Sequence, residues 1–101
     1  MLLRSKDKQT LISIFSQLHY PIEVIAYGSR VNNTAHDTSD LDLVIKSQKA
    51  DDLTHSTLTS IKEQITESNI PILVELRNWY SLPQNFIDQI NKKSEVLFKN
   101  Y

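Results

Sequence analysis

Segments with a helical apolar stripe alternate along this chain with short runs of β-branched and aromatic residues. The first stripe consists of Leu11, Ile14, Phe15 and Leu18. Spacings of three and four residues place these side chains on one face of a helix. Pro21 ends this helix, and residues 22–27 then form a strand-like run that reaches Gly28.

The same alternation continues to the C-terminal region. Residues 41–46 predict a second strand, and residues 50–68 predict a helix whose N-terminus is favoured by Asp51 and Asp52. Residues 72–76 predict a third strand, and a last short helix follows Pro83. The predicted order is αββαβα. It indicates an α/β fold with a small mixed sheet of about three strands flanked by helices, in which the first two strands can be antiparallel.

Length and composition exclude several classes of protein. The chain has 101 residues and a formal net charge of −1, so we expect a single domain over residues 1–101 and no direct nucleic-acid partner. The absence of cysteine excludes disulfides and thiolate catalysis. No apolar run approaches the roughly 20 residues of a membrane span. We therefore expect a cytoplasmic protein that makes no membrane contact.

The chain contains a single glycine, Gly28, which directly follows the first predicted strand and precedes Ser29. Without a Cβ atom, the backbone at Gly28 can turn sharply, and its amide groups can approach a phosphate closely. The Ser29 hydroxyl would add a hydrogen-bond donor. The alternative interpretation is that Gly28 only forms a turn and Ser29 only caps a helix.

Asp40 and Asp42 lie one residue apart where the second predicted strand begins. Because side chains alternate along a strand, both carboxylates lie on one face and Leu41 on the other. Two neighbouring carboxylates repel each other unless a cation lies between them, and Mg²⁺ is the hard cation that such a pair binds together with phosphates. The alternative is a solvated acidic strand end.

Glu75 lies within the third apolar run, between Val74 and Leu76. A carboxylate in such a run needs a cation, an arginine or a polar cleft, because burying an unpaired charge is costly. One interpretation is an edge-strand ion pair with Arg77. The other is a third carboxylate beside Asp40 and Asp42, which would form a two-metal site for nucleotidyl transfer.

These motifs together resemble the DNA polymerase beta nucleotidyltransferase superfamily. The similar segments are Gly28-Ser29-Arg30, then Ser39-Asp40-Leu41-Asp42-Leu43, then Val74-Glu75-Leu76 with Trp79. More narrowly, the chain is similar to small prokaryotic members, the minimal nucleotidyltransferase (MNT) proteins that are paired with HEPN-domain partners. The resemblance covers nearly the whole chain, from the first strand to the last helix.

The resemblance implies a role for each matching residue. Gly28, Ser29 and Arg30 would bind the triphosphate of ATP, and Asp40, Asp42 and Glu75 would be the catalytic carboxylates that hold two Mg²⁺ ions. The sequence departs from the family pattern in two places. The third carboxylate is usually aspartate, and Asn32-Asn33 stands where relatives often have a glycine.

The resemblance favours an antitoxin that transfers AMP from ATP to a tyrosine hydroxyl of a HEPN toxin, in a hetero-oligomer with that partner. A second hypothesis is a binding module with a weak or inactive site that neutralises the partner by forming a complex. A third is a small-molecule nucleotidyltransferase, although 101 residues leave little room for the additional acceptor-binding domain of such enzymes.

Overall fold

The computed structural model describes residues 3–32 and 40–101. The part of the predicted polar loop over 33–39, which includes Asn33, lies outside these residues. The described elements, in chain order, are α1 (Ser5–Phe15), β1 (Ile22–Tyr27), β2 (Leu41–Ser47), the 3₁₀ turn η1 (Ala50–Asp52), α2 (His55–Glu67), β3 (Val74–Asn78), the 3₁₀ turn η2 (Trp79–Ser81), α3 (Gln84–Lys92) and β4 (Glu95–Lys99).

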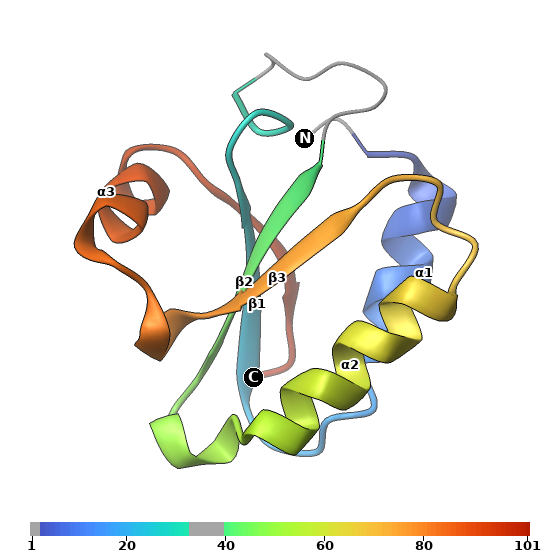
Figure 1. Cartoon of the computed structure of the whole chain (residues 1–101), viewed down its shortest axis with the longest axis horizontal. Coiled ribbons are helices and arrows are strands. Elements are labelled where there is room, and N and C mark those ends of the chain that lie inside the picture. Colours follow the sequence, from blue (N-terminus) through green and yellow to red (C-terminus); the bar gives the residue numbers. More distant parts are fainter. Residues whose placement is uncertain (1–2, 33–39) are drawn as a thin grey trace.

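The strands form one mixed sheet in the order β3-β2-β1-β4. β1 pairs in antiparallel fashion with both β2 and β4, whereas β2 and β3 are parallel. Helices α1 and α2 pack on one face of this sheet and α3 on the other (Figure 1). The predicted α/β class with a small mixed sheet is confirmed, and so is the antiparallel pairing of the first two strands.

The larger core lies between the sheet and helices α1 and α2. Leu41, Leu43 and Ile45 of β2 are fully buried and pack in one cluster with Leu11 and Phe15 of α1. The alternation predicted for β2 is therefore real, because every second side chain packs under the helices. Asp40, Asp42 and Val44 consequently belong to the opposite face.

A smaller cluster covers that opposite face. It contains Ile25, Tyr27, Val44 and Ile90, with Trp79, Leu82 and Phe86 packed against it. Ile90 belongs to α3, so this short helix packs on the face of the sheet that carries Asp42. Trp79 packs against this cluster and thus belongs to the smaller core.

Three details differ from the sequence prediction. A fourth strand, β4, follows α3 and pairs with β1. The third strand runs over Val74–Asn78 rather than 72–76, because residues 70–73 lead into the sheet and Leu73 is 59% exposed. Asp51 and Asp52 form the separate turn η1, and Thr54 caps α2 by accepting a hydrogen bond from the Thr57 amide.

Within residues 3–32 and 40–101, no helix has both the length and the apolar character that crossing a membrane requires.

Candidate active site

The strand register brings two of the three candidate carboxylates, Asp42 and Glu75, to one row of the sheet. Asp42 on β2 lies opposite Tyr27 on β1 and opposite Glu75 on β3. Asp40 lies just before β2, two residues from Asp42 and in the same phase of the strand alternation. Segments more than thirty residues apart in the sequence thus meet on the face that α3 covers.

Gly28 adopts a backbone conformation that few other residues tolerate. Its φ angle is +82°, in the left-handed region. A Cβ atom at this position would lie 2.7 Å from Oδ2 of Asp42. The Gly28 carbonyl oxygen accepts hydrogen bonds from the amides of Val31 and Asn32, at 3.1 and 3.0 Å. The chain therefore makes a helix-like turn directly beside the carboxylate.

The Asp42 carboxylate sits in a partly desolvated and crowded electrostatic environment. Burial raises the pKa of this carboxyl above its usual value, and the nearby Arg77 guanidinium opposes that rise. The negative charges of Asp40 and Glu75 raise the pKa of Asp42 further. Asp40 and Glu75 are thus close enough to act on the charge of Asp42, and additional positive charge here would stabilise the ionised form of Asp42.

Arg77 is the cation that contacts Asp42. Its Nη1 lies 3.4 Å from Oδ1 of Asp42 and donates a second hydrogen bond, of 3.2 Å, to the hydroxyl oxygen of Tyr27. In the part of the chain that the structure describes, Arg77 therefore pairs with Asp42 and not with Glu75, its neighbour on the same strand face. Sequence reasoning missed the roles of both Arg77 and Tyr27.

The donor set fits the magnesium ions that the resemblance implies. Carboxylates are the hard ligands that Mg²⁺ prefers, and the negative charges of Asp40 and Glu75 act against the ionised form of Asp42. As these side chains stand, however, no three histidine, aspartate or glutamate side chains among residues 3–32 and 40–101 form a group that could hold a metal ion. Positive charge at Asp42 comes from Arg77.

Ser29 and Arg30 lie on the turn that follows Gly28. Ser29 is half-buried, whereas Arg30 is only 8% exposed and lines a cavity with Arg4, Asp7 and Pro71. Arg30 thus lies next to the start of α1, where Arg4 donates two hydrogen bonds to the Asp7 carboxylate, at 2.9 and 3.0 Å. The roles of Ser29 and Arg30 in phosphate binding stay predictions.

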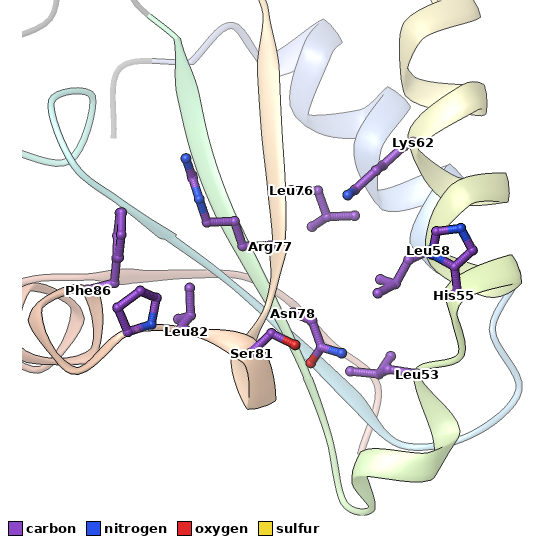
Figure 2. Close-up of a pocket in the computed structure, with 11 residues that line it drawn as sticks. Leu53, His55, Leu58, Lys62, Leu76, Arg77, Asn78, Ser81, Leu82 and Phe86 are labelled. Carbon is purple, nitrogen blue, oxygen red and sulfur yellow. The ribbon is translucent and has the colours of Figure 1, made fainter.

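A cavity of about 570 Å³ lies at the edge strand β3, and Arg77, the partner of Asp42, is among the residues that line it. Arg77 and Phe86 line it on the α3 side of β3, and Leu76 and Lys62 line it on the α2 side (Figure 2). The Arg77 guanidinium lies 5.1 Å from the centre of the Phe86 ring. This ring helps to fix the direction of the arginine side chain.

The fold and the site together define a class of protein. Residues 9–101 match the family model described as "Polymerase beta, Nucleotidyltransferase". The chain belongs to this nucleotidyltransferase family, and it is therefore related to enzymes that transfer nucleotides.

A curated relative gives a more specific similarity. The chain is 33% identical over 95 residues to the probable protein adenylyltransferase MntA of Haemophilus influenzae. The match covers 94% of this chain and 82% of the relative. The chain is thus a homologue of an MNT protein, as the sequence resemblance predicted.

Solved structures share the fold at lower sequence identity. One is a toxin–antitoxin crystal structure with AMP-PNP, which has a TM-score of 0.73, 16% identity, and coverage of 92% of this chain and 73% of the other. Another is a tri-AMPylated HEPN toxin of Shewanella oneidensis in complex with MNT antitoxin, with a TM-score of 0.69, 12% identity, and coverage of 97% and 74%. These similarities establish the fold.

Proposed function

We propose that this chain is a Mg²⁺-dependent antitoxin that transfers AMP from ATP to a tyrosine hydroxyl of a HEPN-domain toxin, with which it forms a hetero-oligomer in the cytoplasm. The proposal treats residues 1–101 as one domain. Membership of the nucleotidyltransferase family supports the reaction class. The adenylyltransferase name of the relative and the AMPylated HEPN toxin in a structural neighbour support the nucleotide and the partner.

One observation carries the proposal for the site. The only positive-φ glycine of the described chain lies against the Asp42 carboxylate, and Glu75 lies opposite Asp42 in the strand register. A triphosphate at the Gly28 turn would thus be placed next to acidic side chains that bind its counter-ions. Backbone amides at a glycine turn of this kind can donate to phosphate oxygens.

Each residue then has a defined task. Gly28, Ser29 and Arg30 orient the triphosphate, and Asp40, Asp42 and Glu75 would hold the magnesium ions. Bound Mg²⁺ supplies charge stabilisation for the attacking and leaving oxygens. Glu75, one methylene longer than the usual aspartate, can reach from β3 towards Asp42 on the neighbouring strand, where it completes the metal site or accepts the tyrosine proton.

The test is transfer of labelled AMP from ATP to the purified HEPN partner. Asp42→Ala should lower the transfer rate by at least roughly a hundredfold, because metal stabilisation supplies several kcal/mol and each 1.36 kcal/mol is a factor of ten. Asp51→Ala is the matched control, since it removes an exposed carboxylate of η1. Unchanged labelling by Asp42→Ala would reject the site, and mass spectrometry of the partner identifies the acceptor residue.

A second candidate is neutralisation of the partner by complex formation alone. Two observations favour it: Asp42 is held by Arg77, and the described carboxylates do not form an assembled metal group. The Asp40→Ala, Asp42→Ala double variant distinguishes the two candidates in cells that express the toxin. Continued protection would support complex formation alone, whereas loss of protection with an intact complex in gel filtration would support catalysis.

A further inference from the structure

β3 is an edge strand of the sheet, and backbone groups on its outer side are open to a further strand. In the described part of the chain, β2 is the only strand that pairs with it. The Leu41 amide donates to the Leu73 carbonyl, at 2.9 Å, and Leu41 lies opposite Val74 in the parallel register. Alternate residues of a strand turn their amide and carbonyl groups to opposite sides. The groups that point away from β2 belong to Val74, Leu76 and Asn78.

The two edges of the sheet differ in how well they are protected against pairing. At the other edge, β4 has charged residues at both ends and an irregular register with β1. Charges and irregularities of this kind hinder the addition of another strand. β3 keeps an unbroken register with β2 over its whole length, and its outward-facing positions are uncharged. The β3 edge is therefore the better one for accepting a further strand.

Two cavities follow this edge on the side of α2. The cavity of about 570 Å³ is lined there by Leu76 of β3 and Leu58 of α2 (Figure 2). A second cavity, of about 260 Å³, is lined by Val74 of β3, by Ile65 of α2 and by Leu73, which is 59% exposed. Val74 and Leu76 are successive side chains on one face of β3, so the two cavities lie one after the other along the strand.

Lys62 lies between the apolar residues that α2 contributes to these cavities. It is exposed, lines the larger cavity and stands four residues after Leu58 and three before Ile65. Because a helix rises about 1.5 Å per residue, these side chains follow one another in steps of roughly 4.5–6 Å. Same-face side chains of a strand are spaced by roughly 6.5 Å. Since α2 runs along β3 (Figure 1), a strand added at the edge would meet Ile65, Lys62 and Leu58 with successive side chains.

The charges at this edge favour an acidic occupant. Lys62 and Arg77 line the larger cavity, and within the described chain no aspartate or glutamate lines it. A second copy of this chain fits poorly, because the α2-facing residues of its β3 include no acid and its own Lys62 would approach the same groove. An acidic segment of another protein matches the charge.

We propose that the β3 edge and the adjoining side of α2 bind an extended segment of a partner protein, which adds to the sheet as a further strand. Its α2-facing side chains are apolar, acidic and apolar at alternate positions, and they meet Ile65, Lys62 and Leu58 in turn. Backbone hydrogen bonds to β3 supply affinity, and the three side chains supply specificity. Neither the Gly28 turn nor Asp42 takes part in this binding, which therefore goes beyond the proposed AMP transfer.

The probe is a short capped peptide in which leucine, glutamate and leucine alternate with threonine, and fluorescence anisotropy follows its binding to the full chain. Lys62→Gln should weaken binding about fivefold, as expected for loss of one exposed ion pair. Lys92→Gln, the matched control, removes an exposed lysine of α3 outside the cavity and should stay within about twofold of the wild type. A peptide with glutamine in place of glutamate should bind the wild type and Lys62→Gln equally.

Hydrogen exchange of the β3 amides tests the backbone pairing directly. With excess peptide, the outward-facing amides of Val74, Leu76 and Asn78 should exchange at least about tenfold more slowly. The amides of Glu75 and Arg77 point to β2 and should change little. A ligand held only by side chains would not protect every second amide, so this alternation identifies an added strand.

Two N-methylated peptides provide the contrary outcomes. Methyl groups on the leucine and glutamate nitrogens block an antiparallel addition, whereas methyl groups on the threonine nitrogens block a parallel one. Loss of binding by only one of these peptides supports the proposed strand addition. Equal effects of both, or no binding of the unmodified peptide, would overturn it. Dimers in analytical ultracentrifugation, with the same amides protected in the absence of peptide, would also overturn it, because the occupant would then be a second copy.

Discussion

Gly28 contributes to the site through the space that it leaves as well as through its φ angle. The left-handed backbone could be adopted by other residues at some energetic cost, but any side chain would meet Oδ2 of Asp42 at 2.7 Å. The Asp42 carboxylate therefore occupies the space that a side chain at position 28 would need. This close approach explains why the chain's one glycine stands between β1 and the polar loop.

We predict that Gly28→Ala destabilises the fold by more than the roughly 1–2 kcal/mol expected for the left-handed backbone alone, because the new Cβ also displaces Asp42. Urea denaturation gives the free energy of unfolding. A double-mutant cycle with Asp42→Ala isolates the steric part. Gly28→Ala should be less destabilising in the Asp42→Ala background, and equal costs in both backgrounds would show that the contact with Asp42 is unimportant.

Sequence reasoning predicted that Asp40 and Asp42 share one face of β2, and it left Glu75 open between an ion pair with Arg77 and a place beside the aspartates. The strand register pairs Glu75 with Asp42. Arg77 was considered only as a partner of Glu75, because the two residues lie close in the sequence. Its pairing with Asp42 depends on the parallel register of β2 and β3, which local patterns do not encode.

At the level of elements, β4 is the part of the fold that the sequence did not reveal. Its five residues are charged at both ends, Val96 is 49% exposed and only Leu97 is buried. A short edge strand with one buried side chain has almost no hydrophobic pattern. The three strands and three helices that were predicted each carry buried apolar side chains, and this pattern made them recognisable from the sequence.

Asn100, just after β4, holds this strand against the start of β1. Its side-chain oxygen accepts a hydrogen bond of 2.7 Å from the Ile22 amide, and its side-chain nitrogen donates one of 3.1 Å to the Tyr20 carbonyl. Asn100→Ala should lower the free energy of unfolding by about 1–2 kcal/mol, because a partly buried amide loses its acceptor.

Denaturant titration of Asn100→Ala and of Asn91→Ala, an exposed position in α3, checks this prediction. The control should stay within about 0.5 kcal/mol of the wild type. A similar small change for Asn100→Ala would mean that β4 is held by its pairing with β1 alone. Hydrogen exchange of the β1 amides gives a second measure, since loosening of the edge should increase their exchange.

For the whole molecule, the two faces of the sheet have separate tasks. The face under α1 and α2 carries most of the buried apolar side chains, whereas the face under α3 carries a small cluster and the row of charges. Adjacent residues of β2 therefore lie alternately in the main core and on the face that carries the charges. Leu43 is fully buried in the main core, and Asp42 next to it faces Arg77.

This division allows a test of the site through the stability of the molecule. Leu43→Ala should lower the free energy of unfolding by about 2–5 kcal/mol, which is a large part of the total for a small domain, while leaving the opposite face intact. MgATP at a concentration a hundred times its dissociation constant should raise the free energy of unfolding by about 2.7 kcal/mol. For a domain of this size, that corresponds to a rise in Tm of about 10 °C or more.

The nucleotide should therefore restore much of the stability that Leu43→Ala loses, as measured by thermal unfolding with and without MgATP. The double variant Asp42→Ala, Leu43→Ala provides the comparison, because it lacks the carboxylate that we assign to the metal and triphosphate site. Its Tm should respond to MgATP much less than that of Leu43→Ala. An equal response would place nucleotide binding away from Asp42, since ligand stabilisation is lost only when the site itself is lost.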